Sequence, residues 1–189
     1  MKTDNKDLKD LGNIAEQIGG LTGGMKDIMG SAMDNAGKLQ KSGPEGAEGD
    51  RPFDETESII VDNKRVAGII IRSGDIIDSI QLVYDDKSQG EIHGSGFGGS
   101  PHSVKIGAED GLAAIEGYKG ISFGGGRALT GLLIRTKKGQ TYGPFGNRRG
   151  GQKFLLTVPA DAEFKGVCGS VNSGGNGGFL SSLGLIYKK

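Results

Sequence analysis

From residue 53 onward, apolar residues occur in short runs that glycine, asparagine, aspartate or serine separate. The runs are rich in valine, isoleucine and leucine, and residues 80–84 and 132–136 show apolar–polar alternation. A period of two is typical of a strand with one buried face, and no helical period persists beyond two turns. Many short strands are typical of a sandwich, barrel or prism. The pattern predicts an all-β domain with strands at residues 58–61, 66–72, 78–84, 103–106, 113–118, 129–136, 153–158, 163–170 and 183–187.

The first 40 residues follow a different period. Apolar and small residues recur at alternating spacings of three and four from Leu8 to Leu39, the heptad pattern of an amphipathic helix. Glycines interrupt it, and each costs about 0.8–1 kcal/mol relative to alanine inside a helix. We expect a short helical or disordered segment that orders on a partner or self-assembles through its apolar stripe. Its acidic residues disfavour membrane insertion. Residues 41–51, which are small or charged, are expected to form a linker.

Composition narrows the classes of function. Glycine makes up 37 of 189 residues, but it has no period of three and there are only 5 prolines, which excludes a collagen-like helix. The formal net charge of +0 argues against non-specific nucleic-acid binding, which needs a basic surface. The single cysteine excludes an intrachain disulfide and a cysteine-based zinc site. No signal peptide is evident, so we expect a cytoplasmic protein by default, and export by a route without an N-terminal signature stays open.

A weak threefold repeat runs through the β region. Each unit combines a glycine-rich loop with a segment that leads into a strand. The loops are residues 94–100, 124–126 and 174–178, and the corresponding strand entries are residues 74–80, 109–115 and 177–183.

At these repeats the sequence resembles the jacalin-related lectins. The stretches that carry the resemblance are residues 73–85, 141–146 and 178–187, with residues 52–54 similar to the family's opening strand. The resemblance implies a β-prism of three four-stranded Greek-key sheets with pseudo-threefold symmetry, formed by residues 52–189. It also implies carbohydrate binding without catalysis. Residues 1–48 have no counterpart in the family.

In that family the sugar site is a Gly-x-x-x-Asp turn that faces a second glycine-rich loop. The matching residues here are Gly74, Asp75, Ile76, Asp78, Gly98 and Gly99. The resemblance assigns Asp78 as the carboxylate acceptor, the amides of Asp75 and Ile76 as donors, and the two later glycines as the facing loop. Sugar hydroxyls both donate and accept, so fixed amides and a carboxylate can bind them, and glycine allows a close approach of the backbone. The alternative is an ordinary turn in which Asp78 caps backbone amides.

The other two copies depart from the motif. The C-terminal copy has Ser181 in place of the aspartate, which implies a degenerate second site formed by Gly178, Phe179, Leu180 and Ser181. Loss of a charge-assisted hydrogen bond costs about 1.5–3 kcal/mol, or roughly ten- to a hundredfold in affinity. The middle copy carries Ala113 at this position and is expected not to bind. One intact site out of three is therefore predicted.

The resemblance favours glycans of the mannose/glucose class. Galactose-binding relatives use a free glycine amine at the start of the domain, whereas about 50 residues precede Phe53 here. One site per chain binds weakly, so we predict a homo-oligomer, with residues 1–40 as the candidate assembly device. No cofactor, metal or nucleic-acid partner is expected. The alternative is an assembly or partner-binding module built on a degenerate lectin domain, with the N-terminal helix for oligomerisation or docking.

Few residues suggest catalysis. His93 and His102 lie in a Gly/Ser-rich stretch and are both expected at the surface. Cys168 lies in a strand-like run and is expected to be a buried small apolar residue. No set of nucleophile, base and orienting group can be named, so we do not expect an enzyme.

Overall fold

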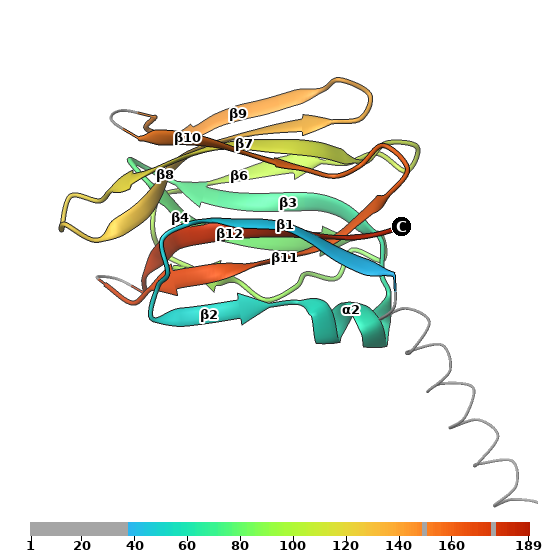
Figure 1. The fold of residues 1–189 in the computed structure, drawn as a ribbon, viewed down its shortest axis with the longest axis horizontal. Helices are drawn as coiled ribbons and strands as arrows, with labels where there is room; N and C mark the ends of the chain where they lie inside the picture. Colours follow the sequence, from blue (N-terminus) through green and yellow to red (C-terminus); the bar gives the residue numbers. More distant parts are fainter. Residues whose placement is uncertain (1–37, 149–150, 175–176) are drawn as a thin grey trace, which may run out of the picture. The chain divides into compact units, whose positions relative to one another are not determined.

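The computed structural model describes residues 38–148, 151–174 and 177–189, so the predicted N-terminal segment lies outside it except for residues 38–40. The described chain forms three four-stranded antiparallel sheets, as predicted (Figure 1). The first sheet has the order β1 (Leu39–Gly46), β12 (Phe179–Lys188), β11 (Glu163–Asn172) and β2 (Arg51–Asp54). The second has the order β10 (Gln152–Thr157), β7 (Leu112–Ile121), β8 (Arg127–Thr136) and β9 (Thr141–Gly146). The third has the order β5 (His93–Gly94), β4 (Ile77–Tyr84), β3 (Val66–Ser73) and β6 (Ser100–Lys105).

The three sheets turn one face each toward a shared apolar core. Isoleucine and leucine supply most of it, and β-branched residues suit the pleated backbone of the strands that carry them. Burial of this apolar surface is the main force that stabilises the sheets against one another. The largest fully buried side chains come from all three sheets: Ile69, Ile71, Ile77, Ile80, Leu82, Leu112, Ile115, Leu129, Leu132, Ile134, Leu156 and Leu180.

One irregularity recurs in every sheet. The two central strands form an antiparallel pair, and near the start of the second strand one residue is skipped by the pairing. The skipped residues are Asp78 in β4, Thr130 in β8 and Ser181 in β12. Each is a β-bulge, a feature that bends the strand and redirects a side chain. These three residues therefore occupy equivalent positions in the threefold repeat.

A glycine of the neighbouring edge strand lies against each bulge. The three glycines, Gly94, Gly146 and Gly46, have φ values of +116°, +76° and +126°. A Cβ atom at these positions would lie 2.1, 2.6 and 2.2 Å, respectively, from the carbonyl oxygen of the bulged residue. Glycine is required here both for its positive φ and for this close approach of two backbones.

The prediction that Ala113 occupies the position equivalent to Asp78 and Ser181 in the middle repeat is wrong. Ala113 lies in β7, the first strand of its central pair, whereas the bulge lies in β8 at Thr130. The feature that all three repeats share is a glycine four positions before the bulge, namely Gly74, Gly126 and Gly177. Residues 109–115 resemble the other strand entries only in their run of apolar residues.

Two further segments differ from the sequence prediction. Residues 41–51, expected to be a linker, contain most of β1, which pairs with β12 from Leu39 to Gly46. β1 is an edge strand without a fully buried side chain, so its backbone pairs in the absence of an apolar pattern. Residues 58–61, expected to be a strand, lie in the helix α2 (Thr56–Asp62), in which only Ile59 is buried. No helix of the described residues is long and apolar enough to cross a bilayer.

A buried polar pair joins the first sheet to the third. Glu55, which follows β2, accepts a hydrogen bond from the Val167 backbone N–H at 2.9 Å, and its other carboxylate oxygen lies 3.0 Å from His93 Nε2. The His93 ring stacks on Phe53 with 4.0 Å between ring centroids. The surface position predicted for His93 is therefore wrong, because His93 lies in β5 against Glu55 and Phe53 and is only 6% exposed. His102 is half-buried.

The Glu55 pair should contribute measurably to stability. We predict that Glu55→Ala lowers the free energy of unfolding by about 3 kcal/mol, because it leaves His93 and the Val167 amide buried without their partner. Glu55→Gln, which keeps an acceptor, should cost less. Glu57→Ala is the matched control, since Glu57 is exposed on α2. Urea unfolding checks all three variants, and equal losses for Glu55→Ala and Glu57→Ala would contradict the role of the pair.

Candidate functional site

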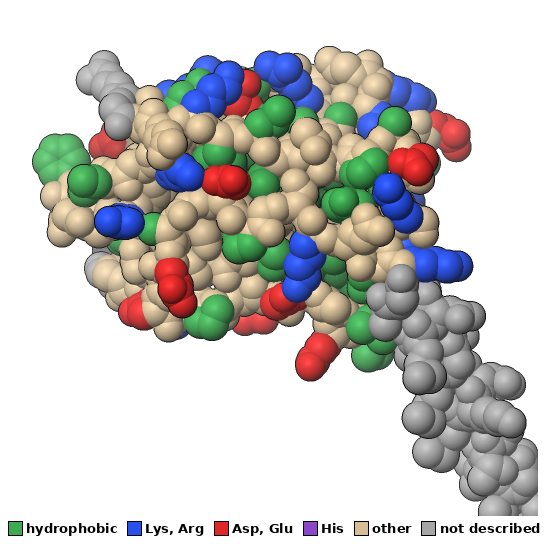
Figure 2. All heavy atoms as spheres, viewed as in Figure 1, with side chains coloured by type: hydrophobic (Ala, Val, Ile, Leu, Met, Phe, Trp, Pro, Cys, Tyr) green, Lys and Arg blue, Asp and Glu red, His purple; other side chains and the backbone are tan. Residues whose placement is uncertain are grey.

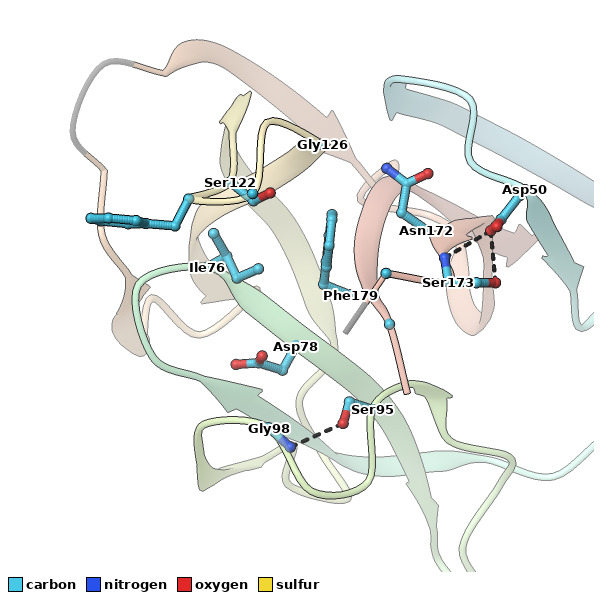
Figure 3. A pocket seen from close by; sticks show the side chains of 14 residues that line it. Asp50, Ile76, Asp78, Ser95, Gly98, Ser122, Gly126, Asn172, Ser173 and Phe179 are labelled. Atoms are coloured by element: carbon cyan, nitrogen blue, oxygen red, sulfur yellow. Dashed lines mark hydrogen bonds between the residues drawn. The ribbon is translucent and has the colours of Figure 1, made fainter. Parts of the chain in front are cut away.

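A hollow of about 650 Å³ lies where the turns of the three central strand pairs converge. The β3–β4 turn and the start of β4 contribute Ile76 and Asp78, the β7–β8 turn contributes Ser122, and the end of β11 contributes Asn172 (Figure 3). A volume of this size falls within the roughly 300–1,000 Å³ of small-molecule sites. The hollow therefore combines residues from distant parts of the sequence at one end of the domain.

The carboxylate of Asp78 stands at one side of this hollow (Figure 3). The bulge in β4 takes Asp78 out of the strand pairing, and the preceding turn is closed by a hydrogen bond from the Gly74 N–H to the Ile76 carbonyl at 3.2 Å. Burial raises the pKa of Asp78 above its usual value, while the Gly74 N–H and the charge of Arg72 act in the opposite direction. The hydrogen bond and the charge supplied by the chain thus offset only part of the cost of burying the ionised carboxylate.

The same turn presents two unused donors. Among the described residues, the N–H groups of Asp75 and Ile76 donate to no other group of the chain. The Asp75 carbonyl accepts a hydrogen bond from the Asn147 N–H at 3.2 Å, which fixes the turn to the end of β9. Fixed donors and a nearby carboxylate acceptor are therefore available together for a ligand.

The predicted facing loop lies directly against Asp78. A Cβ atom at Gly98 would lie 2.4 Å from one carboxylate oxygen of Asp78, and one at Gly99 would lie 2.5 Å from the other. A Cβ at Gly74 would lie 3.9 Å from the Gly99 Cα atom. The structure thus brings together all six residues predicted for this site, Gly74, Asp75, Ile76, Asp78, Gly98 and Gly99. Any side chain in the facing loop at these two positions would displace the carboxylate.

Two residues that sequence reasoning missed hold the facing loop in place. The Ser95 hydroxyl accepts hydrogen bonds from the N–H groups of Phe97 and Gly98 at 3.2 and 3.0 Å. Arg72 donates through Nε to the Gly98 carbonyl at 2.8 Å and through Nη2 to the Gly99 carbonyl at 3.1 Å. A serine that precedes a glycine-rich turn is a recognisable sequence signal, because its hydroxyl bonds local backbone groups. Arg72 gives no such signal, since its partners lie 26 and 27 residues away.

The bulged residue of the C-terminal repeat, Ser181, is not accessible to a ligand. Ser181 is only 1% exposed, and its hydroxyl lies 3.0 Å from both the Ser170 hydroxyl and the Ser170 carbonyl. A Cβ atom at Gly49 would lie 2.4 Å from the Ser181 hydroxyl, so the β1–β2 loop covers it. Of the predicted degenerate site, Leu180 is fully buried, while Gly178 and Phe179 line the hollow. Thr130, the third bulged residue, is 4% exposed and donates to the Tyr118 carbonyl at 3.3 Å.

Comparison with known proteins identifies the domain. Among protein families, the jacalin-like lectin domain matches residues 42–186, more than three quarters of the chain. The chain belongs to this family. Its members are carbohydrate-binding domains without catalytic activity. The match begins within β1, earlier than residue 52, the predicted start of the domain.

Solved structures of similar fold support the assignment. A mannose-binding lectin from Champedak is 21% identical, with a TM-score of 0.66 over 80% of this chain and 98% of that chain. A mannose-binding jacalin-related lectin from Ananas comosus is 24% identical, with a TM-score of 0.63 over 79% of this chain and 97% of that chain. A mannose-specific jacalin-related lectin from Morus nigra is 20% identical, with a TM-score of 0.64 over 80% and 96%. A search of curated proteins gives no significant match.

Other chemistry has little support in the described part of the lectin domain. No group of three or more His, Cys, Asp or Glu side chains is placed to hold a metal ion there. Cys168 is buried, as predicted, and burial raises the pKa of its thiol, which disfavours the reactive thiolate. On the face shown in Figure 2, basic and acidic side chains are interspersed, in keeping with the balanced net charge.

The partial burial of Asp78 has a consequence for stability. A carboxyl group whose pKa is higher in the folded than in the unfolded chain binds its proton more tightly when folded, so its ionisation destabilises the folded state above that pKa. We predict that Asp78→Asn raises the free energy of unfolding at pH 7. The difference from wild type should shrink as the pH falls through the raised pKa, above the usual 3.8.

Thermal or urea unfolding at several pH values measures this difference. Asp75→Asn is the matched control, because Asp75 lies exposed in the same turn. If Asp78→Asn were less stable than Asp75→Asn at pH 7, the Asp78 carboxylate would stabilise the fold by capping backbone amides, which would contradict the destabilising role predicted for it.

Proposed function

We propose that the lectin domain binds a hexose of the mannose/glucose class at the Asp78 turn. The observation that supports this most strongly is the combination of one half-buried carboxylate, two amide donors without internal partners and a facing loop that carries no side chain at Gly98 and Gly99. The similar structures from Champedak, Ananas comosus and Morus nigra are named as mannose-binding or mannose-specific proteins.

The chemistry of a hexose suits this arrangement. Neighbouring hydroxyls of a pyranose each donate and accept hydrogen bonds. The Asp78 carboxylate can accept from two of them, and the N–H groups of Asp75 and Ile76 can donate to the same oxygens. A hydrogen bond to an ionised acceptor is worth more than a neutral one, so Asp78 is expected to dominate the affinity. The backbone at Gly98 and Gly99 lets the ring approach without a steric barrier.

The choice of sugar class rests on the start of the domain. Galactose-binding relatives use a free amine on a glycine there, according to the resemblance described above. In this chain the backbone continues from β1 through Ala47, whose N–H donates to the Ser181 carbonyl at 2.9 Å, into β2. No amine is available at that place, which favours mannose or glucose over galactose.

Calorimetric titration with methyl α-mannoside tests the proposal. We predict that Asp78→Asn weakens binding roughly ten- to a hundredfold, because a charged acceptor is replaced by a neutral one. Ser181→Ala is the control at the equivalent bulge, and its affinity should equal that of wild type because the Ser181 hydroxyl is closed to ligands. Methyl α-galactoside should bind more weakly than the mannoside. Undiminished mannoside binding by Asp78→Asn would remove Asp78 from the site.

A second prediction concerns the facing loop. Gly98→Ala places a methyl group against the Asp78 carboxylate and should reduce mannoside affinity at least tenfold, since the carboxylate must move to relieve the contact. Gly96→Ala is the matched control, because a Cβ atom there meets only the Ile92 side chain at 3.9 Å. The same titration checks both variants, and equal affinities would show that this loop does not border the sugar.

The alternative function, an assembly or partner-binding module, is favoured by one observation. At two of the three equivalent bulges, a buried hydroxyl that donates to a backbone carbonyl replaces the carboxylate. These two repeats therefore present no exposed side chain at the bulge that could bind a sugar. Absence of any hexose binding by wild type would select this alternative. If the Asp78 site does bind, its single copy per chain means that the predicted homo-oligomer would be needed for avidity.

A further inference from the structure

We propose that the buried pair of Glu55 and His93 positions the loop that faces the Asp78 turn, so that a side chain of the first sheet controls the sugar affinity of a site in the third. Glu55 and His93 are then positioning residues, which act through the facing loop and not by contact with the sugar. This inference rests on the proposed function and deepens it, because it names what keeps the site ready for a ligand.

The edge strand that carries the glycine against the Asp78 bulge is unusually short. In the first and second sheets the corresponding glycines, Gly46 and Gly146, end β1 and β9, which have eight and six residues. In the third sheet Gly94 ends β5, which has two residues and pairs with β4 through His93 and Gly94. A strand held by few backbone hydrogen bonds opens more easily than a long one. The glycine beside Asp78 therefore needs support from outside its own sheet.

Side chains of the first sheet provide this support. His93 Nε2 lies 3.0 Å from one oxygen of Glu55, and the His93 ring stacks on Phe53 with 10° between the ring planes. The other Glu55 oxygen accepts from the Val167 N–H at 2.9 Å, and the Glu55 N–H donates to the Val167 carbonyl at 3.2 Å. A Cβ atom at Gly166 would lie 3.0 Å from this second oxygen, so the backbone of β11 limits its movement. β5 is thereby fixed to the first sheet as well as to β4.

A short row of contacts connects His93 to the facing loop. The next residue, Gly94, lies against the bulge, and the Ser95 N–H donates to the Asp78 carbonyl at 3.0 Å. The Ser95 hydroxyl accepts from the Gly98 N–H at 3.0 Å, and Gly98 lies directly against the Asp78 carboxylate. A displacement of His93 therefore displaces Gly98 as well, because no long flexible segment separates them.

The burial of the pair makes its loss felt at this loop. The side chains of His93 and Glu55 are only 5% and 7% exposed. Removal of either partner leaves the other buried without its hydrogen bond, which favours opening of β5 toward water. If the facing loop is in its binding position for only a fraction of the time, the apparent dissociation constant rises by the inverse of that fraction.

Calorimetric titration of the full chain with methyl α-mannoside tests the inference. Glu55→Ala and His93→Ala should each weaken binding about five- to tenfold, as expected if the loop is in place about a tenth to a fifth of the time. The double variant should bind no more weakly than either single variant, because the two residues act as one unit. Glu55→Gln should restore most of the affinity, since its amide can donate to His93 Nε2 while its oxygen accepts from the Val167 N–H.

A control separates this role from a general loss of stability. Lys165→Met removes another buried charge of the first sheet, because Lys165 is only 4% exposed and its ammonium group donates to the carbonyls of Asn63 and Lys64, which follow α2. We expect this variant to unfold at a lower urea concentration than wild type. At a temperature where urea unfolding shows every variant to be folded, its affinity for the mannoside should equal that of wild type.

Amide NMR spectra of the proteins without sugar give a second readout. In Glu55→Ala the signals of Gly98 and Gly99 should move or broaden, and in Lys165→Met they should keep their wild-type positions. If Glu55→Ala keeps both the affinity and these signals, or if Lys165→Met weakens binding as much, the positioning role is wrong and the proposed function stands. If wild type does not bind the mannoside, the proposed function fails, and the spectra alone decide whether the pair positions the loop.

Discussion

The contact between a bulged residue and an edge-strand glycine is the constraint on which the site depends. In the first and third sheets the residue after the glycine donates its N–H to the carbonyl of the bulged residue, Ala47 to Ser181 at 2.9 Å and Ser95 to Asp78 at 3.0 Å. This hydrogen bond can form only because Gly46 and Gly94 adopt positive φ and carry no Cβ. It fixes the bulged side chain at the end of the sheet and brings the following loop against it.

The same backbone arrangement therefore occurs three times with different chemistry. At Asp78 the side chain is too polar to be fully buried and stays at the border of the hollow, where its pKa is raised by partial burial. At Ser181 and Thr130 a small hydroxyl is satisfied by a carbonyl of the neighbouring strand, so the backbone closes over it. One side chain per repeat thus decides between a ligand site and a structural hydrogen bond. The loss of stability expected at Asp78 is typical of a functional carboxylate whose partial burial is not fully offset by hydrogen bonds and opposite charges.

The parts of the fold that bury apolar side chains could be predicted from the sequence, because β3, β4, β8 and β12 carry the isoleucine and leucine runs of the core. The six residues at the Asp78 turn were named from the resemblance to the lectin family, and the structure brings them together, while their binding of a sugar stays a prediction. Edge strand β1 could not be predicted, because its side chains are mostly exposed and its pairing involves the backbone. Arg72 and His93 were missed for another reason, because each depends on contacts between residues far apart in the chain. The equivalence of Thr130 was missed although Gly126 lies four positions before it, because the apolar run of residues 109–115 is similar to the other strand entries.

The central claim is that a hexose binds at the Asp78 turn and not at the C-terminal repeat. Titration of isotope-labelled protein with methyl α-mannoside, followed by two-dimensional amide NMR, tests this claim residue by residue. The account predicts that the largest shift changes occur at the amides of Asp75 and Ile76, with smaller changes at Gly98 and Gly99 and none at Ser181. Changes centred on residues 178–181, with Asp75 and Ile76 unmoved, would contradict it.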